Sequence, residues 1–212
     1  MGTWLTPAVC LAPGGRGLNE QPMQIVFRLE GRVDAWLAAG GRVETPRPSA
    51  CPSCGHGRVA FAGWYPRHTR RGKVDIQRVS CTADGCGQPG HSLLPDVLVT
   101  GRIDLASVIG WGLEARAAGA THARIGGVLG VPVSTVRGWL RRADRHGGRL
   151  ASRLFAVAAA ADPTVRAPPF GGSVAALVAA ARAAAGTVER LSDEPVDVWP
   201  FAVMQTGGRL LG

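Results

Sequence analysis

Residues 51–86 read CPSCGHGRVAFAGWYPRHTRRGKVDIQRVSCTADGC and contain four of the five cysteines of this 212-residue chain. Two residues separate Cys51 from Cys54, and four separate Cys81 from Cys86. A glycine follows each pair, and its backbone freedom lets N–H groups point at the sulfur atoms. Four thiolates are a ligand set that tetrahedral Zn²⁺ commonly takes in proteins. The spacing therefore predicts a structural zinc site.

The residues between the two cysteine pairs alternate apolar and polar side chains on both sides of Arg70-Arg71-Gly72. This pattern predicts a β-hairpin, so that the pairs and the hairpin together form a zinc ribbon over residues 51–97. Because so small a segment cannot build an adequate core, the metal would supply about 10 kcal/mol or more of folding free energy. His91 is an alternative to Cys86 as the fourth ligand. The alternative to a metal site is a set of unrelated cysteines or a redox pair, although no βαβ pattern accompanies them.

A second informative stretch, THARIGGVLGVPVSTVRGWLRRADR, spans residues 121–145. Thr121 is a good N-cap for a short helix, and Gly130 suits the turn that follows it. Pro132 suits the first turn of the next helix, which would run to Arg145 and measure about 21 Å. The order helix, glycine turn, helix predicts a helix-turn-helix.

The two sides of the second helix differ in chemistry. Its apolar residues recur at the helical period and should point inward: Val136, Trp139 and Leu140. A helix of this length fits the major groove of duplex DNA, with its N-terminal half near the base edges. We expect base contacts from Ser134, Thr135 and Arg137. We expect phosphate contacts from Arg141, Arg142 and Arg145.

The predicted hairpin also carries basic residues, and we expect its phosphate contacts to come from Arg70, Arg71 and Lys73. Trp64 and Tyr65 lie nearby and would either stack on bases or belong to a core. The alternative for the helical part is an ordinary three-helix bundle with solvated arginines. The pair Gly126-Gly127 departs from the helix-turn-helix pattern, because each glycine costs up to about 1 kcal/mol within a helix.

Net charge points to a polyanionic partner. The chain carries 24 Lys+Arg and 15 Asp+Glu, a net charge of +9. The excess is greatest over residues 101–150, which hold eight basic and three acidic side chains. Clustered basic charge favours nucleic acid as the partner, although it also suits a merely soluble surface.

The remaining segments complete a prediction that is mainly α with a small β zinc ribbon. Residues 1–22 are expected to be disordered, so that Met1 or Met23 could be the true start. Residues 23–50 predict a short strand, a short helix and a proline-containing linker. The helix-turn-helix is placed at residues 101–146. Residues 147–212 predict Ala-rich C-terminal helices, over 149–161 and 173–191, and a tail that packs through Trp199, Phe201 and Val203.

Several of these motifs resemble a known family. The resemblance rests on Cys51-Pro-Ser-Cys54-Gly55, Gly63-Trp-Tyr-Pro-Arg67, Ile76-Gln-Arg78-Val-Ser-Cys81, Cys86, His91-Ser-Leu-Leu-Pro95 and Val131-Pro-Val-Ser-Thr-Val-Arg-Gly-Trp-Leu140. These segments are similar to the zinc ribbon and the homeodomain-like helix-turn-helix at the start of insertion-sequence transposases and related uncharacterised bacterial proteins. The resemblance covers about residues 45–146 and implies binding to DNA at the end of a mobile element or a related site.

The chain departs from a complete transposase. Strand transfer needs three acidic metal ligands on a catalytic domain of ordinary size, roughly 100–150 residues. Only 66 residues follow His146, and four of their five acids cluster between residues 189 and 197. A closed four-thiolate site also has no open position for water. We therefore expect no enzyme, but a mobile-element factor or a transcriptional regulator.

The expected partner is double-stranded DNA, with a second copy of the chain or a transposase subunit as further candidates. The alternative function is a zinc-dependent protein-interaction module that assists a transposase or a polymerase. No stretch is long and apolar enough for a membrane span, and residues 1–11 lack the basic start of a signal peptide. We expect a cytoplasmic, nucleoid-associated location.

Overall fold

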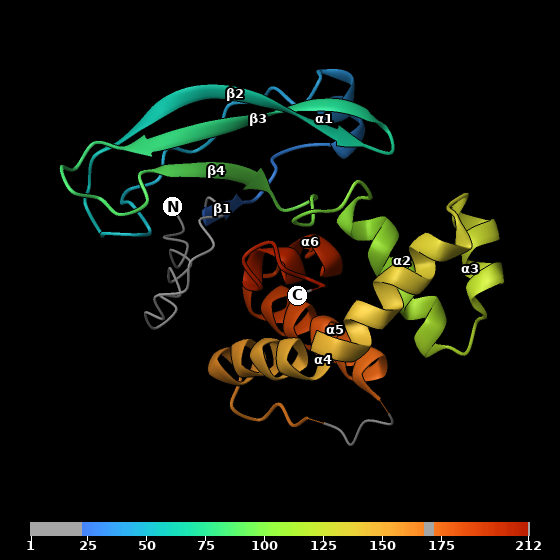
Figure 1. The fold of residues 1–212 in the computed structure, drawn as a ribbon. Helices are drawn as coiled ribbons and strands as arrows, with labels where there is room; N and C mark the ends of the chain where they lie inside the picture. Colours follow the sequence, from blue (N-terminus) through green and yellow to red (C-terminus); the bar gives the residue numbers. More distant parts are fainter. Residues whose placement is uncertain (1–22, 168–171, 212) are drawn as a thin grey trace.

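The computed structural model describes residues 23–167 and 172–211. The expectations about residues 1–22, including the choice between Met1 and Met23, depend on a segment that lies outside the described residues. In chain order the elements are β1 (Met23–Phe27), α1 (Val33–Ala38), β2 (Val59–Thr69), β3 (Gly72–Cys81), β4 (Gly90–Pro95), α2 (Ala106–Ala117), α3 (His122–Leu129), α4 (Val133–Ala161), α5 (Ser173–Ser192) and α6 (Val198–Gln205). Figure 1 shows the sheet and α1 on one side of the molecule and the helices α2–α6 on the other. The fold is therefore mixed, with six helices and one small sheet among the described residues.

The sheet has the strand order β1-β4-β3-β2. The hairpin predicted between the cysteine pairs is confirmed as β2 and β3, which pair from Val59–Cys81 at one end to Thr69–Gly72 at the other. The strand predicted near residue 23 is also confirmed as β1. Strand β4 was not predicted, and it pairs antiparallel with β3 and parallel with β1. As a result, the predicted ribbon and the segment before it belong to one sheet.

The helices share one large core. The three residues predicted to point inward from α4 are buried, which confirms that assignment: Val136, Trp139 and Leu140. The C-terminal tail packs as predicted, because α6 buries Trp199 against α2 so closely that a Cβ at Gly110 would lie 2.1 Å from its ring. None of the described helices is both long and apolar enough to cross a membrane.

Helix α4 differs from the prediction. It runs without a break from Val133 to Ala161, so the expected helix end near Arg145 and the separate helix over 149–161 are both wrong. The boundary expected between residues 146 and 147 falls inside this helix. The glycines at this point do not end the helix. Instead, the missing side chain of Gly147 lets the start of α5 lie close against α4. A Cβ at Gly147 would lie 2.6 Å from the backbone oxygen of Ser173.

The segment from Asp96 to Leu105, here called the linking segment, lies between the sheet and the helices. The guanidinium of Arg67 on β2 donates to the backbone oxygens of Val99 and Arg102, at 2.6 and 2.7 Å. On the helical side, the Thr100 N–H donates to the Gly208 oxygen at 2.9 Å. The linking segment is thereby fixed from both directions just before α2 begins.

The two adjacent glycines of α4 should respond in opposite directions to alanine. Gly147→Ala forces a methyl group into the Ser173 backbone and should lower the free energy of unfolding by about 1–3 kcal/mol. Gly148 faces open space, with no atom within 4 Å of the position that a Cβ would take, so Gly148→Ala should stabilise the helix by up to about 1 kcal/mol. Urea unfolding followed by circular dichroism measures both. Equal effects at the two positions would mean that α5 does not approach α4 at Gly147.

Candidate metal site and basic surface

Four thiols form a compact cluster at the end of the hairpin away from its turn. The sulfur atoms of Cys51, Cys54, Cys81 and Cys86 all lie within 4.8 Å of one another. Cys51 and Cys86 are 3.9 Å apart, and Cys54 and Cys81 are 3.6 Å apart. A tetrahedral metal with bonds of roughly 2.3 Å places its sulfur ligands about 3.8 Å apart. The cluster is therefore a possible metal site whose spacing fits a four-thiolate ion.

Local backbone geometry aims donors at this cluster. The Ser53 N–H donates to the Cys51 sulfur, and the Ala83 N–H donates to the Cys81 sulfur, each at 3.4 Å. Gly55 follows the first pair with a φ of 74°, a conformation that favours glycine. Each cysteine pair thus turns a backbone N–H group toward one of its own sulfur atoms, and the expected role of a glycine holds for Gly55 after the first pair.

His91 sits beside the cluster in a different role from the one considered for it. Its Nε2 lies 3.2 Å from the Cys51 sulfur, and its side chain is fully buried. The sulfur of Cys86, in contrast, belongs to the four clustered ligand atoms. The arrangement brings Cys86 into the ligand set and leaves His91 hydrogen-bonded to a ligand.

The pKa values of the thiols show why a cation suits the cluster. Burial alone would raise the pKa of Cys51, but hydrogen bonds from the backbone of Cys54 and Ser53 and from His91 outweigh it and lower the pKa to about 6. The Ala83 N–H lowers the pKa of Cys81, but burial and the neighbouring thiols raise it to about 12. One thiolate forms easily, and further ones repel it. A bound cation would remove that repulsion.

The turn between α3 and α4 has two of the three features that the sequence predicted. The Thr121 side chain caps α3 by accepting from the Arg124 N–H at 3.3 Å. Gly130 ends α3 with a φ of 63°. Pro132 lies one residue before the first residue of α4 and not inside its first turn. These contacts fix the direction in which α4 leaves the turn.

The glycine pair in α3, which departs from the expected pattern, has a partial explanation. A Cβ at Gly126 would lie 2.9 Å from the Val131 oxygen, so only glycine lets α3 approach the turn this closely. Gly127 faces open space, and nothing in the structure explains it.

The polar side of α4 faces solvent. Ser134, Arg137, Arg141 and Arg145 are exposed, whereas Thr135 and Arg142 are half-buried. Arg137, Arg141 and Arg145 are spaced by four residues, which places them on one stripe of the helix. These three arginines and Ser134 are here called the basic face. No ion pair in the described part of the chain involves any of these arginines.

The basic residues of the hairpin are less free than expected. The Arg70 guanidinium forms an ion pair with Asp104, whose carboxylate is 3% exposed. Arg71 pairs with Asp34 of α1 at 2.7 Å, with both side chains exposed. Lys73 is exposed. Arg67, another basic residue of the hairpin, points inward to the linking segment.

The two hairpin aromatics have separate environments. Tyr65 is half-buried and packs on the small core beneath the sheet. Trp64 is exposed, with the Arg42 guanidinium 5.9 Å from the centroid of its ring. A core role holds for Tyr65, while Trp64 lies on the surface.

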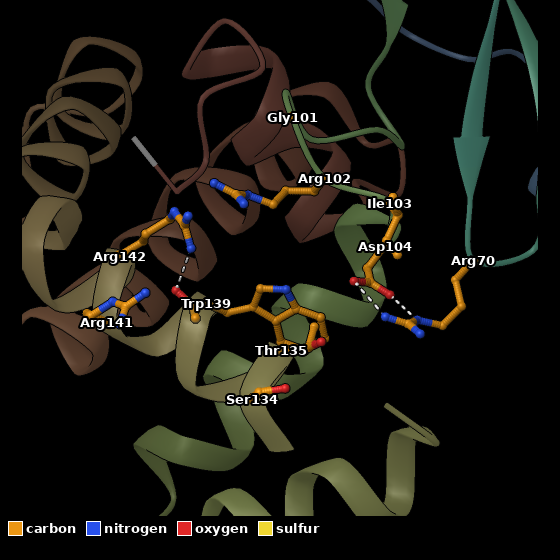
Figure 2. Close-up of a pocket in the computed structure, with 11 residues that line it drawn as sticks. Arg70, Gly101, Arg102, Ile103, Asp104, Ser134, Thr135, Trp139, Arg141 and Arg142 are labelled. Carbon is orange, nitrogen blue, oxygen red and sulfur yellow. Dashed lines mark hydrogen bonds and ion pairs between the residues drawn. The ribbon is translucent and has the colours of Figure 1, made fainter. Parts of the chain in front are cut away.

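A cleft brings the hairpin turn, the linking segment and α4 together. It has a volume of about 350 Å³ and contains three predicted arginines, Arg70, Arg141 and Arg142, along with Ser134 and Thr135. Figure 2 shows Arg102 and Asp104 entering it from the linking segment. Sequence reasoning missed these two residues, because only the contact with the hairpin brings them opposite α4.

No protein-family model, curated protein or solved structure matches this chain. The function proposed for the site therefore rests on its geometry and chemistry.

The metal site should bind one ion through thiolates alone. With Co²⁺ as a spectroscopic probe, Cys86→Ala should reduce the thiolate-to-metal charge-transfer absorption, because one sulfur ligand is lost. His91→Gln should keep that absorption and weaken metal affinity by about 10–100-fold, since it removes only a partner of Cys51. The opposite result, a silent Cys86→Ala and a His91→Gln that loses a ligand, would assign the fourth position to His91.

Proposed function

We propose that this protein binds duplex DNA, with α3, the Gly130 turn and α4 acting as a helix-turn-helix. The proposal rests on one observation: the two sides of α4 differ in burial and in charge. Its apolar residues are buried in the core, while Ser134, Arg137, Arg141 and Arg145 are exposed and form no ion pair with any described acid. An exposed helix with this chemistry matches the width of the major groove.

The order of residues along α4 assigns their contacts. Ser134 and Arg137 lie in the first two turns, where a recognition helix meets base edges. Arg137 can donate two hydrogen bonds to guanine, the most common specific contact of this type. Arg141 and Arg145 lie roughly 6 and 12 Å further along the axis and would reach phosphates.

The metal is proposed to be a structural Zn²⁺ held by Cys51, Cys54, Cys81 and Cys86. Zinc suits four thiolates in a closed tetrahedral site and supplies folding free energy there. The cluster lies at the opposite end of the hairpin from its turn, so the metal supports the hairpin and makes no contact with DNA. In this proposal the protein is non-catalytic and acts either as a mobile-element factor or as a transcriptional regulator.

A second function, protein interaction, is favoured by a different surface. Trp111 on α2 is 40% exposed and Val128 on α3 is 62% exposed, and both line a cleft of about 350 Å³. A second copy of the chain or a transposase subunit could cover these apolar side chains. Analytical ultracentrifugation of the wild type and of Val128→Ser distinguishes self-association through this cleft from a monomer.

DNA binding should depend strongly on salt. With about six phosphate contacts, affinity should fall roughly a thousandfold between about 50 and 200 mM salt. Fluorescence anisotropy with a labelled duplex measures this dependence, and a flat response would contradict the proposal.

Sequence recognition should depend on Arg137. After fragments are selected from a genomic library, Arg137→Ala should cost about 1–3 kcal/mol on the selected site and relax its sequence preference. Arg166→Ala is the matched control, because Arg166 is exposed beyond the far end of α4. Equal losses for the two variants would show that α4 does not read bases.

A further inference from the structure

The cleft in Figure 2 contains two arginines that face each other and form no ion pair within the described part of the chain. Arg102 enters from the linking segment and Arg142 from α4, and their guanidinium groups point toward one another. Arg142 donates to the Gly138 oxygen at 3.1 Å and otherwise has no bond to the described residues. The Nε of Arg102 is buried and has no hydrogen-bond partner there.

The local carboxylate cannot neutralise this pair. Asp104 is the only acid among the eleven residues lining the cleft, all of which are described, and it is engaged by Arg70. Burial lowers the pKa of Arg102, and the nearby positive charge of Arg142 lowers it further. Two such groups held together are stabilised by an anion that bridges them.

Other features of the cleft suit an oxyanion. The hydroxyl-bearing side chains of Ser134 and Thr135 line it from the first turn of α4. Arg141 lies at the rim and is exposed. Arg141 and the two hydroxyls thus add positive charge and donors to the cleft, with the hydroxyls on the other side of the Trp139 ring from Arg102 and Arg142 (Figure 2).

We propose that Arg102 and Arg142 together clamp one phosphate of the DNA backbone in this cleft. The identity of the phosphate rests on the proposed DNA binding, whereas the anion site itself rests on the two arginines. The clamp would fix the position of α4 along the duplex, because Arg142 belongs to α4 and Arg102 belongs to the segment that the hairpin holds. Arg102 would then add a phosphate contact that lies outside the helix-turn-helix.

The first arm of the test uses inorganic phosphate and the full metal-loaded chain. The thermal midpoint of the wild type should be higher in sodium phosphate than in sodium chloride of the same ionic strength and pH. Arg102→Gln and Arg142→Gln should each lose this difference. Arg166→Gln should keep the difference between the two salts. Arg166 follows the C-terminal end of α4, and that end lies roughly 28 Å from Arg142 along the helix axis.

The second arm uses a labelled 20-base-pair duplex and the same four proteins. Arg102→Gln and Arg142→Gln should each weaken binding by on the order of tenfold, as expected for the loss of a charged hydrogen bond. Each should also reduce the slope of log affinity against log salt by about one. Arg166→Gln should behave as the wild type.

The two arms separate the possible failures. If neither variant changes the phosphate effect or DNA affinity, the clamp is overturned while DNA binding stands. If the variants lose only the phosphate effect, the cleft takes free phosphate and the assignment to the DNA backbone is overturned. If the wild type binds no DNA but shows the phosphate effect, the proposed function fails and the anion site survives.

Discussion

The contact of Arg67 with the linking segment is the interaction on which the arrangement of the molecule depends. Its guanidinium donates to the Val99 and Arg102 oxygens, and burial lowers the pKa of this arginine. A charged group accepts that burial only because its donors are satisfied by fixed backbone oxygens. The Arg70 N–H adds a bond of 2.7 Å to the Ile103 oxygen. Together these contacts attach the hairpin to the residues that lead into α2, so the sheet and the helices hold one relative position.

The thiol cluster and the contact with the linking segment therefore lie at the two ends of one hairpin. The thiol cluster lies at the end near Val59 and Cys81, and the turn near Arg70 contacts the linking segment. In the proposed function, zinc acts on DNA binding indirectly, by keeping the strands rigid enough to hold that segment. The two ends of the hairpin thus have different roles, and its basic residues differ accordingly. Arg67 and Arg70 join the two parts of the protein, whereas Arg71 and Lys73 stay at the surface.

Much of the candidate site could be predicted from sequence because its signals are local. Cysteine spacing identified the thiol cluster, and the period of Val136, Trp139 and Leu140 identified the buried side of α4. Three features depended on distant contacts and were missed or wrong. β4 is short, and its pairing with β1 joins residues far apart in sequence. Gly147 suggests a helix end when only its neighbours in sequence are considered, but here it admits the Ser173 backbone. Arg102 and Asp104 acquire their surroundings only from the hairpin.

The most direct test of this arrangement is the DNA affinity of Arg67→Gln, measured by anisotropy after circular dichroism has confirmed unchanged helix content. Arg67 points into the protein and cannot touch DNA, so any effect must come from how it holds the linking segment. We predict a loss of at least about tenfold in affinity, which corresponds to about 1.4 kcal/mol. Wild-type affinity in a folded Arg67→Gln protein would contradict the claim that this contact holds the sheet and the helices in the relative position that DNA binding needs.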